Sequence, residues 1–298
     1  MRFEAITLSR GALRFSALAA GEGPVVLLLH GFPDSPLTFT HQLTALAAAG
    51  YRAVAVTMRG YEPGSQPSDG DYHAVRMAED VATWTSELAD GPVHLVGHDW
   101  GANVACAAAA LTPGKFSSLT MLAVPHPVRF GEAYAACSHQ QQRSAYVLAF
   151  QSPGFEQEIV ADDCAFLENL WRTWSPSWEI SPSALTEMKN AFRQPGVAGA
   201  TLEYYRQAFD LASAAGQDSA ALFTRPIIVP TLGLCGRDDA CVPPDIFLGA
   251  MQTQDFPVHL ETACIEGAGH FLQSEQPETV NRMLLDWFPR AERRVRGH

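Results

Sequence analysis

Positive charge is scarce in this sequence, and its scarcity argues against one class of partner. The 298 residues include 20 Lys and Arg against 32 Asp and Glu, which gives a formal net charge of -12. A protein that binds nucleic acid needs a surplus of basic side chains to neutralise phosphates. We therefore expect no nucleic-acid partner.

Long apolar runs and clustered cysteines are also missing. The opening residues, MRFEAITLSR, lack the apolar stretch of a signal peptide, and no run is long enough to span a bilayer. The six cysteines are scattered, without a CxxC pair or a Cys/His cluster that would indicate a metal site or a dense disulfide framework. These features predict a cytoplasmic protein with reduced thiols, no bound metal and no membrane span.

What the sequence does contain is a regular alternation of strand and helix patterns. The apolar run VVLLL at Val25–Leu29 is typical of a strand buried on both faces. After an N-terminal hairpin that turns at Arg10-Gly11, further strands are predicted at Arg52–Thr57, Pro92–Val96, Leu119–Val124, Ile227–Leu234 and His259–Ile265. Helices are predicted to follow them, among them Ala74–Leu88, Ala102–Leu111 and a segment near Glu278–Trp287. This order predicts an α/β fold, a mostly parallel sheet with helices on both faces.

The alternation stops between about Pro127 and Arg225. This region consists of helical patterns interrupted by Ser-Pro and Pro-Gly pairs. We predict a core formed by residues 1–126 and 226–298, with residues 127–225 inserted as a helical lid. The lid is expected to carry substrate contacts, because binding residues concentrate on connections held by a rigid scaffold.

One pentapeptide, Gly97-His98-Asp99-Trp100-Gly101, lies between a predicted strand and a predicted helix. A Gly-x-Ser-x-Gly sequence in this position marks the nucleophile turn of a hydrolase, and here aspartate replaces the serine. The two glycines supply the small neighbours that the turn requires, and the helix N-terminus favours an ionised Asp99. The alternative is that Asp99 is an ordinary helix N-cap.

A second motif, His30-Gly31-Phe32-Pro33, directly follows the first buried strand. Its turn is expected to bring the backbone N–H of Phe32 toward Asp99, opposite the N–H of Trp100. Two such donors form an oxyanion hole. We interpret His30 as a scaffold residue of the turn.

Two further segments, LCGRDDACVP and EGAGHF, follow the last two predicted strands. The remaining members of a nucleophile–acid–histidine series are expected in these positions. His270 is the predicted base, and Asp239 or its neighbour Asp238 is the acid that orients the imidazole.

At this point the sequence resembles the α/β-hydrolase superfamily and, within it, the epoxide hydrolases. HGFPDS, RGYEPGSQP, GHDWG and GAGHF match that family's pattern in order, and the resemblance covers nearly the whole chain. In the lid, Tyr146 precedes Phe-Gln-x-Pro-Gly and Tyr205 precedes Arg, as the family's two lid tyrosines do. The resemblance implies that these tyrosines donate hydrogen bonds to the epoxide oxygen.

The expected chemistry agrees with these residue types. Asp99 is ionised at pH 7 and attacks an epoxide carbon, which forms an alkyl ester. A tyrosine, with a pKa of about 10, protonates the departing oxygen. His270 then activates water to hydrolyse the ester, and the product is a vicinal diol.

No cofactor is expected. The expected partners are an apolar epoxide and water, and a homo-oligomer is left open. The substrate contacts are assigned to Trp100, Phe150 and Trp171, with Trp174 and Trp178 as further candidates for the pocket.

Other functions of the same fold are less favoured. A haloalkane dehalogenase also has an aspartate in the nucleophile turn, which is called the elbow. Its second halide donor, however, commonly occupies the position of Phe32, which has no side-chain N–H. A fluoroacetate dehalogenase would have arginines where Trp100 and Asn103 stand. A serine esterase is excluded at this elbow. A ligand-binding receptor on a hydrolase scaffold is the least favoured function, because all triad members are present.

Overall fold

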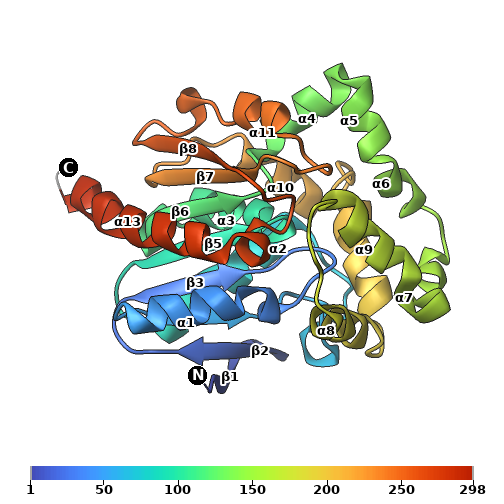
Figure 1. Cartoon of the computed structure of the whole chain (residues 1–298), viewed down its shortest axis with the longest axis horizontal. Coiled ribbons are helices and arrows are strands. Elements are labelled where there is room, and N and C mark those ends of the chain that lie inside the picture. Colours follow the sequence, from blue (N-terminus) through green and yellow to red (C-terminus); the bar gives the residue numbers. More distant parts are fainter. Residues whose placement is uncertain (1, 297–298) are drawn as a thin grey trace.

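The chain forms one eight-stranded sheet with helices around it (Figure 1). The structure, a computed structural model, describes the backbone of residues 2–296 and the side chains of residues 2–294. The strands are β1 (Glu4–Arg10), β2 (Leu13–Ala20), β3 (Val25–Leu29), β4 (Arg52–Val56), β5 (Val93–His98), β6 (Phe116–Leu122), β7 (Thr231–Gly236) and β8 (Leu260–Ile265). The helices are α1 (Thr40–Ala48), α2 (Ala74–Leu88), α3 (Trp100–Leu111), α4 (Pro127–Ala136), α5 (Ser138–Arg143), α6 (Ala145–Ala149), α7 (Phe155–Trp174), α8 (Pro182–Phe192), α9 (Val197–Gln207), α10 (Ala214–Phe223), α11 (Pro244–Ala250), α12 (Leu272–Glu275) and α13 (Pro277–Arg296).

The sheet has the order β1-β2-β4-β3-β5-β6-β7-β8. The hairpin β1–β2 and the pair β2–β4 are antiparallel, and every pair from β4 to β8 is parallel. The prediction of a mostly parallel sheet is therefore confirmed. Because the carboxyl ends of parallel strands share one edge of a sheet, the loops that follow β3, β5, β7 and β8 meet there.

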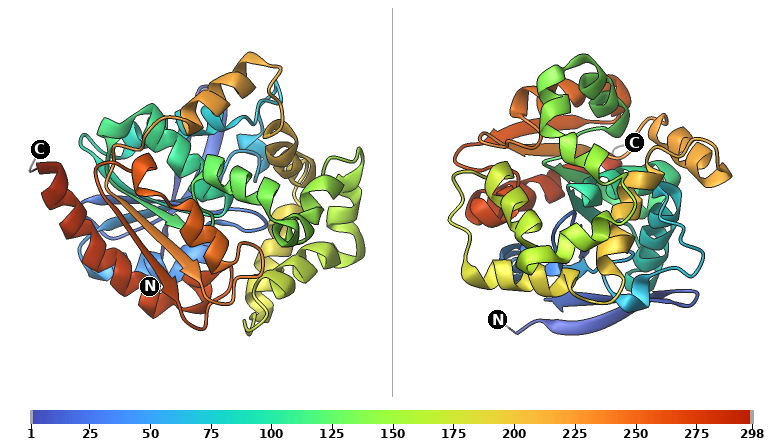
Figure 2. Two further views of the ribbon diagram at one scale, coloured as in Figure 1. Left: turned by 90° about the horizontal axis from the view of Figure 1, so that it is seen from above. Right: turned by 90° about the vertical axis from the view of Figure 1, so that its right-hand side faces the viewer.

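Two apolar layers hold the helices against the sheet. Strand β4 shows the alternation that this requires: Val54 and Val56 belong to one buried cluster, and Ala53 and Ala55 belong to the other. The first layer contacts α2, α3 and α10, and the second contacts α1 and α13. Figure 2 shows the helices on both sides of the sheet.

Helices α4–α10 form a helical insertion between β6 and β7. Helices α6–α9 gather at one side of the sheet in Figure 1. Helix α10 differs from them because it packs against α2 and α3 of the core. A connection between parallel strands needs a crossover element, and α10 provides it for β6 and β7. The part of the expected lid that stands away from the sheet therefore ends before α10.

The strand boundaries differ most from the prediction at β7. The apolar pattern predicted a strand from Ile227, but β7 begins at Thr231. Pro230 lacks the N–H that a strand residue donates, and Ile228 is 55% exposed, so the apolar residues before the proline lie outside the sheet.

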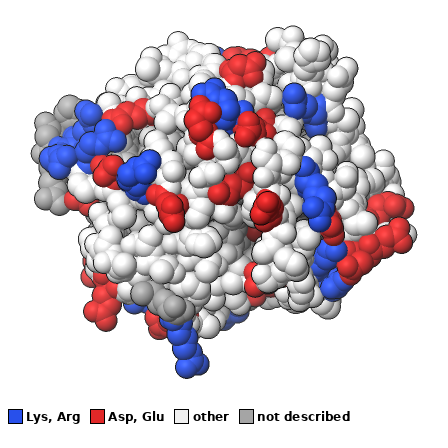
Figure 3. All heavy atoms as spheres, viewed as in Figure 1, with Lys and Arg blue, Asp and Glu red and all other residues white. Residues whose placement is uncertain are grey.

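The surface carries both signs of charge. On the face drawn in Figure 3, most basic side chains lie near acidic ones, and large areas are uncharged. Among the helices that the structure describes, none combines the length and the apolar composition needed to cross a membrane.

Candidate active site

Asp99 occupies the sharp turn between β5 and α3. Its backbone has φ 53° and ψ -120°, a conformation that is uncommon for a residue with a side chain. A Cβ atom at Gly97 would lie 2.2 Å from the Gly101 carbonyl oxygen, and one at Gly101 would lie 2.1 Å from the Leu29 carbonyl oxygen. Only glycine fits at either position, so the two glycines of the motif permit the turn that presents Asp99.

Asp99, His270 and Asp239 form a continuous chain of contacts. His270 Nδ1 lies 2.9 Å from Asp239 Oδ2, and His270 Nε2 lies 3.4 Å from Asp99 Oδ2. The other oxygen of Asp239 accepts hydrogen bonds from the N–H groups of Cys241 and Val242 at 2.8 and 2.9 Å. All three triad side chains are buried. The structure thus places Asp239, and not Asp238, against the imidazole.

The buried carboxylates control the protonation of His270. Burial alone would lower the pKa of His270, but the charge and hydrogen bond of Asp239, together with Asp99, raise this pKa to about 10. Burial alone would likewise raise the pKa of Asp99, but His270 and the Phe32 N–H hold it below its ordinary value. The resting site therefore contains an Asp99 carboxylate beside an imidazolium.

The N–H of Phe32 donates a hydrogen bond to Asp99 Oδ1 at 2.7 Å. Trp100 is the first residue of α3, and the first N–H groups of a helix have no partner within it. The Phe32 N–H therefore borders the Asp99 carboxylate, and the role of the Trp100 N–H as the second oxyanion-hole donor stays a prediction. His30 supports this turn, since its Nε2 accepts from the Met58 N–H at 3.1 Å and burial lowers its pKa to about 4.

Two tyrosines from the helical insertion lie against this elbow. The Tyr205 ring packs edge to face on Phe32 and Trp100, with centroids at 5.3 and 5.1 Å, and its buried hydroxyl makes no hydrogen bond of ordinary geometry with the described residues. Tyr146 lies 6.0 Å from Tyr205 between ring centroids, and its hydroxyl is 3.8 Å from Cys241 Sγ. Burial raises the pKa of both phenols well above 10.0, so both stay protonated.

Tyr204 shows why its neighbour faces the elbow. The Tyr204 hydroxyl donates to the Arg59 carbonyl oxygen at 2.6 Å. The guanidinium of Arg59 is in turn bound to both oxygens of the buried Asp80 at 2.7 and 2.8 Å. Adjacent residues of a helix point about 100° apart. Anchoring Tyr204 to the core therefore turns Tyr205 toward Asp99.

The expected substrate contacts divide into two groups. Phe150 is buried beside Tyr205 and Phe32, with its ring centroid 4.8 Å from that of Tyr205 and 5.4 Å from that of Phe32. Trp171 instead donates its indole N–H to the Pro33 carbonyl oxygen at 2.9 Å and packs against Trp178, 5.1 Å away. These contacts make Trp171 part of the contact between the insertion and the core.

No group of three or more His, Cys, Asp or Glu side chains within the described part of the chain is arranged to hold a metal ion.

Comparison with known proteins agrees with this geometry. The family model described as alpha/beta hydrolase fold matches residues 24–277. A curated protein of Siraitia grosvenorii, epoxide hydrolase 3, is 32% identical, and the alignment covers 96% of this chain and 98% of that protein. Epoxide hydrolase 2 of Caenorhabditis elegans is 31% identical over 87% of this chain and 72% of its own length. The chain belongs to the epoxide hydrolase family.

Solved structures of epoxide hydrolases have the same fold. Potato epoxide hydrolase I superimposes with a TM-score of 0.82 at 26% identity, covering 97% of this chain and 100% of that one. An epoxide hydrolase from an endophytic Streptomyces gives a TM-score of 0.79 at 28% identity, covering 96% and 95%.

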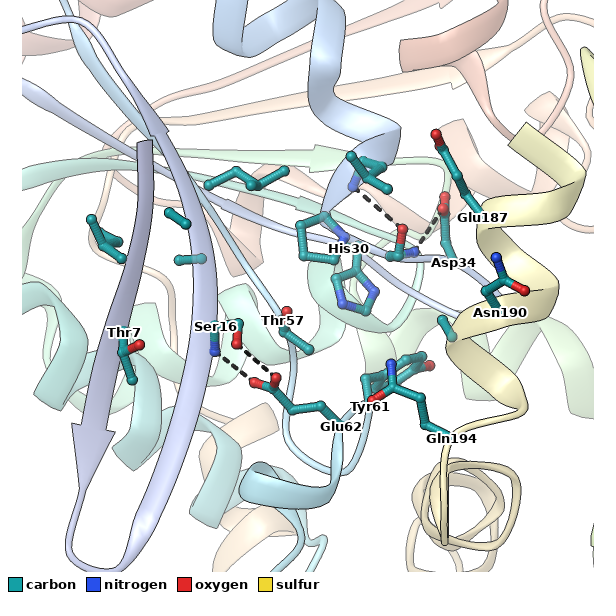
Figure 4. Close-up of a pocket in the computed structure, with 18 residues that line it drawn as sticks. Thr7, Ser16, His30, Asp34, Thr57, Tyr61, Glu62, Glu187, Asn190 and Gln194 are labelled. Carbon is teal, nitrogen blue, oxygen red and sulfur yellow. Dashed lines mark hydrogen bonds between the residues drawn. The ribbon is translucent and has the colours of Figure 1, made fainter. Parts of the chain in front are cut away.

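This member of the epoxide hydrolase family also has a cavity of about 530 Å³ that the sequence did not predict. It lies between the hairpin β1–β2, the loop after β3 and helix α8. In Figure 4, Asp34 stands between His30 and the α8 residues Glu187 and Asn190. Burial raises the pKa of Asp34 to about 7, and one oxygen of Asp34 has no hydrogen-bond partner among the described residues.

Tyr61 forms another wall of this cavity, and its buried hydroxyl is also without a partner among the described residues. Phe192 of α8 packs edge to face on both Phe32 and Tyr61, with centroids at 5.5 and 5.9 Å. The cavity wall is thus joined to the turn that supplies the Phe32 N–H. Asp34 and Tyr61 fall within HGFPDS and RGYEPGSQP, but these motifs did not predict a cavity beside them, because α8, which forms its other wall, is more than 100 positions away.

Proposed function

We propose that this protein hydrolyses an apolar epoxide to a vicinal diol, with Asp99 as nucleophile. The observation that carries the proposal is the buried Tyr205 phenol, which packs on Phe32 and Trp100 and makes no hydrogen bond of ordinary geometry with the described residues. A carboxylate with two buried, protonated phenols nearby suits a reaction in which a carbon is attacked while an oxygen leaves.

In the first half-reaction, an oxygen of Asp99 forms a bond to an epoxide carbon as the carbon–oxygen bond of the ring breaks. The ring oxygen takes a proton from Tyr146 or Tyr205, and the products are an ester on Asp99 and a phenolate. The imidazolium of His270 returns a proton to the phenolate. This transfer leaves a neutral His270, and esterification removes the Asp99 charge that had helped to keep it protonated.

In the second half-reaction, neutral His270 takes a proton from water, which attacks the carbonyl carbon of the ester. The N–H groups of Phe32 and Trp100 stabilise the oxyanion of the intermediate. The ester carbon–oxygen bond then breaks, and the alkoxide takes the proton of the newly formed Asp99 carboxylic acid as the diol forms. The balance is one water and one epoxide consumed for one diol, with Asp99 ionised and His270 protonated again.

The same proposal assigns the parts of the chain. Residues 1–126 and 226–298 form the catalytic core, and residues 127–225 form a cap that brings Tyr146, Tyr205 and Phe150 to the substrate. Trp100, next to Asp99, contacts the substrate directly, whereas Trp171 acts through the contact between cap and core. Cytoplasmic location is part of the same proposal, which leaves the assembly of identical chains open.

A small substrate panel tests it. Purified protein is incubated with styrene oxide, a fatty epoxide, a bromoalkane and a p-nitrophenyl ester, with Asp99→Asn as the inactive control. Diol formation from an epoxide is expected in the wild-type protein and should be lost in the variant. Turnover of the bromoalkane alone would favour dehalogenation. No turnover of either epoxide would contradict the proposal.

A further inference from the structure

The loop that carries His270 is held by a serine and a carboxylate that belong to no motif of the site. Three consecutive backbone N–H groups converge on this pair. The Gly269 N–H donates to Glu275 Oε2 at 2.8 Å, and the His270 N–H donates to Ser175 Oγ at 2.9 Å. The Phe271 N–H lies 3.0 Å from Glu275 Oε1 and 3.3 Å from Ser175 Oγ. The backbone on either side of the catalytic imidazole is thereby fixed.

Ser175 lies at the carboxyl end of α7, in the helical insertion, 95 positions before His270. Its hydroxyl donates to Glu275 Oε1 at 2.6 Å. A serine hydroxyl has one proton, so its contact with the His270 N–H is made as an acceptor. The fit is close, because a Cβ atom at Gly269 would lie 2.6 Å from Ser175 Oγ.

The remaining contacts of His270 complete its immobilisation. Burial lowers the pKa of His98 to about 3, so its neutral ring can donate from Nε2 to the His270 carbonyl oxygen, 2.9 Å away. The Trp174 ring meets the imidazole edge to face at 5.1 Å, and the Trp174 carbonyl oxygen accepts from the Ala240 N–H at 3.1 Å. Two adjacent residues of the insertion, Trp174 and Ser175, therefore contact both the loop that carries His270 and the loop that carries Asp239.

We propose that Ser175 and Glu275 are positioning residues that hold the His270 backbone so that its Nε2 stays beside Asp99, and that the insertion thereby supports the ester-hydrolysis step. This inference rests on the proposed function. Neither side chain needs to touch the substrate. Their effect falls on ester hydrolysis, which uses His270 as a base. Asp99 attacks the epoxide without a base, and His270 returns a proton to the phenolate only after the ring has opened, so the alkylation rate does not depend on this transfer.

The first test separates the two half-reactions in Ser175→Ala. Single-turnover kinetics with styrene oxide measure alkylation, and intact-mass analysis follows the decay of the ester. A displacement of about 1 Å can lower a rate by about 100-fold, so hydrolysis is expected to slow roughly 10- to 100-fold. Alkylation should change by less than about 3-fold, because its groups are untouched. Ser177→Ala is the matched control, since Ser177 is exposed two residues further on.

Glu275→Gln provides a second variant of nearly the same shape. It removes a negative charge close to His270 and one acceptor of the loop. The pKa of His270 should fall, so the pH profile of ester hydrolysis should move to lower pH while its maximum rate also falls. Ser175→Ala, which changes no charge, should lower the rate without this shift. If the two residues only supported the fold, the pH profile of ester hydrolysis would not differ between Glu275→Gln and Ser175→Ala.

A third measurement does not depend on the substrate. The proton between His270 Nδ1 and Asp239 gives a low-field NMR signal, which should broaden or disappear in Ser175→Ala and persist in Ser177→Ala. If the wild-type protein opens no epoxide, the proposed function fails and this signal alone decides the positioning role. If the ester forms but both steps slow equally, or if the signal is unchanged in Ser175→Ala, the inference is overturned.

Discussion

Replacing the proposed proton donors by phenylalanine should lower activity without lowering stability. Tyr205→Phe removes a buried hydroxyl that has no hydrogen-bond partner among the described residues, and Tyr146→Phe removes one whose nearest polar contact is Cys241 Sγ at 3.8 Å. An unsatisfied buried hydroxyl costs about 1–3 kcal/mol in the folded state. Each substitution should therefore leave the free energy of unfolding unchanged or raise it by up to about 1 kcal/mol, which is about 2 °C in Tm.

The effect on alkylation should be much larger. One phenol can partly replace the other, so each single variant should lose about 10- to 1000-fold, the range of a single acid or oxyanion donor. This loss corresponds to about 1.4–4 kcal/mol of barrier. The double variant should be nearly inactive toward epoxides. Displacement of bromide needs no proton donor, so any turnover of a bromoalkane should survive.

Stopped-flow quenching of tryptophan fluorescence follows alkylation, because Trp100 adjoins Asp99, and a thermal melt gives Tm. Tyr204→Phe is the matched control. Its hydroxyl is bound to the Arg59 carbonyl oxygen at 2.6 Å, so its loss should cost about 1 kcal/mol of stability. It should slow alkylation less than Tyr205→Phe does, because it loosens the anchor beside Tyr205 but keeps both proton donors. The reasoning is refuted if the double variant alkylates at the wild-type rate, or if Tyr204→Phe slows alkylation as much as Tyr205→Phe.

Four further predictions test the site. His270→Gln should still form the ester and then stall, so its intact mass should rise by one substrate; full turnover without this adduct would refute the assignment. Asp239→Asn should impair ester hydrolysis far more than Asp238→Asn, and the reverse order would make Asp238 the acid. Because the pKa of His270 is raised from 6.5 to about 10, its protonation stabilises the fold fully below pH 6.5, and this stabilisation is lost as pH rises to about 10. Its contribution to unfolding free energy should fall by about 1.4 kcal/mol per pH unit in that window, and an equally steep fall in denaturant titrations of Asp239→Asn would contradict this origin. Gly101→Ala should destabilise by about 1–3 kcal/mol or more, since its Cβ would lie 2.1 Å from the Leu29 carbonyl oxygen; an unchanged melting temperature would show that the elbow relaxes.

The sequence predicted those parts of the molecule whose geometry is decided locally. GHDWG and HGFP each constrain a few neighbouring dihedral angles, and each follows a buried parallel strand. The turn at Asp99 and the approach of the Phe32 N–H, 67 positions away, could therefore be predicted from the two motifs together. Strand β3 was predicted to the residue because an apolar run of its length, buried on both faces, has no competing pattern. The start of β7 was missed because the apolar pattern continues through Pro230 into residues that lie outside the sheet.

The parts that were not predicted depend on contacts distant in the sequence. The sequence around Ser175 does not distinguish it from other serines near prolines, and only the folded chain brings it to His270. Trp171 was predicted to line an apolar substrate pocket, and this stays a prediction; that its indole N–H donates to the Pro33 carbonyl oxygen could not be predicted. The choice between Tyr204 and Tyr205 came from the resemblance to known proteins, and its physical reason, the anchoring of Tyr204 on Arg59, is visible only in three dimensions.

The position of α10 has a consequence for how such a protein can diversify. The crossover between β6 and β7 is complete without α4–α9, because α10 packs against α2 and α3 and returns the chain to the sheet. Recombination that exchanges the chain between Pro127 and Ser213 would thus leave the strand order, the second apolar layer and the packing of α10 on α2 and α3 unchanged. Exchange that extends through α10 would replace a helix that packs against α2 and α3 of the core. We expect chimeras of the first kind to fold with new substrate ranges, provided that the donor supplies a hydroxyl at the position of Ser175.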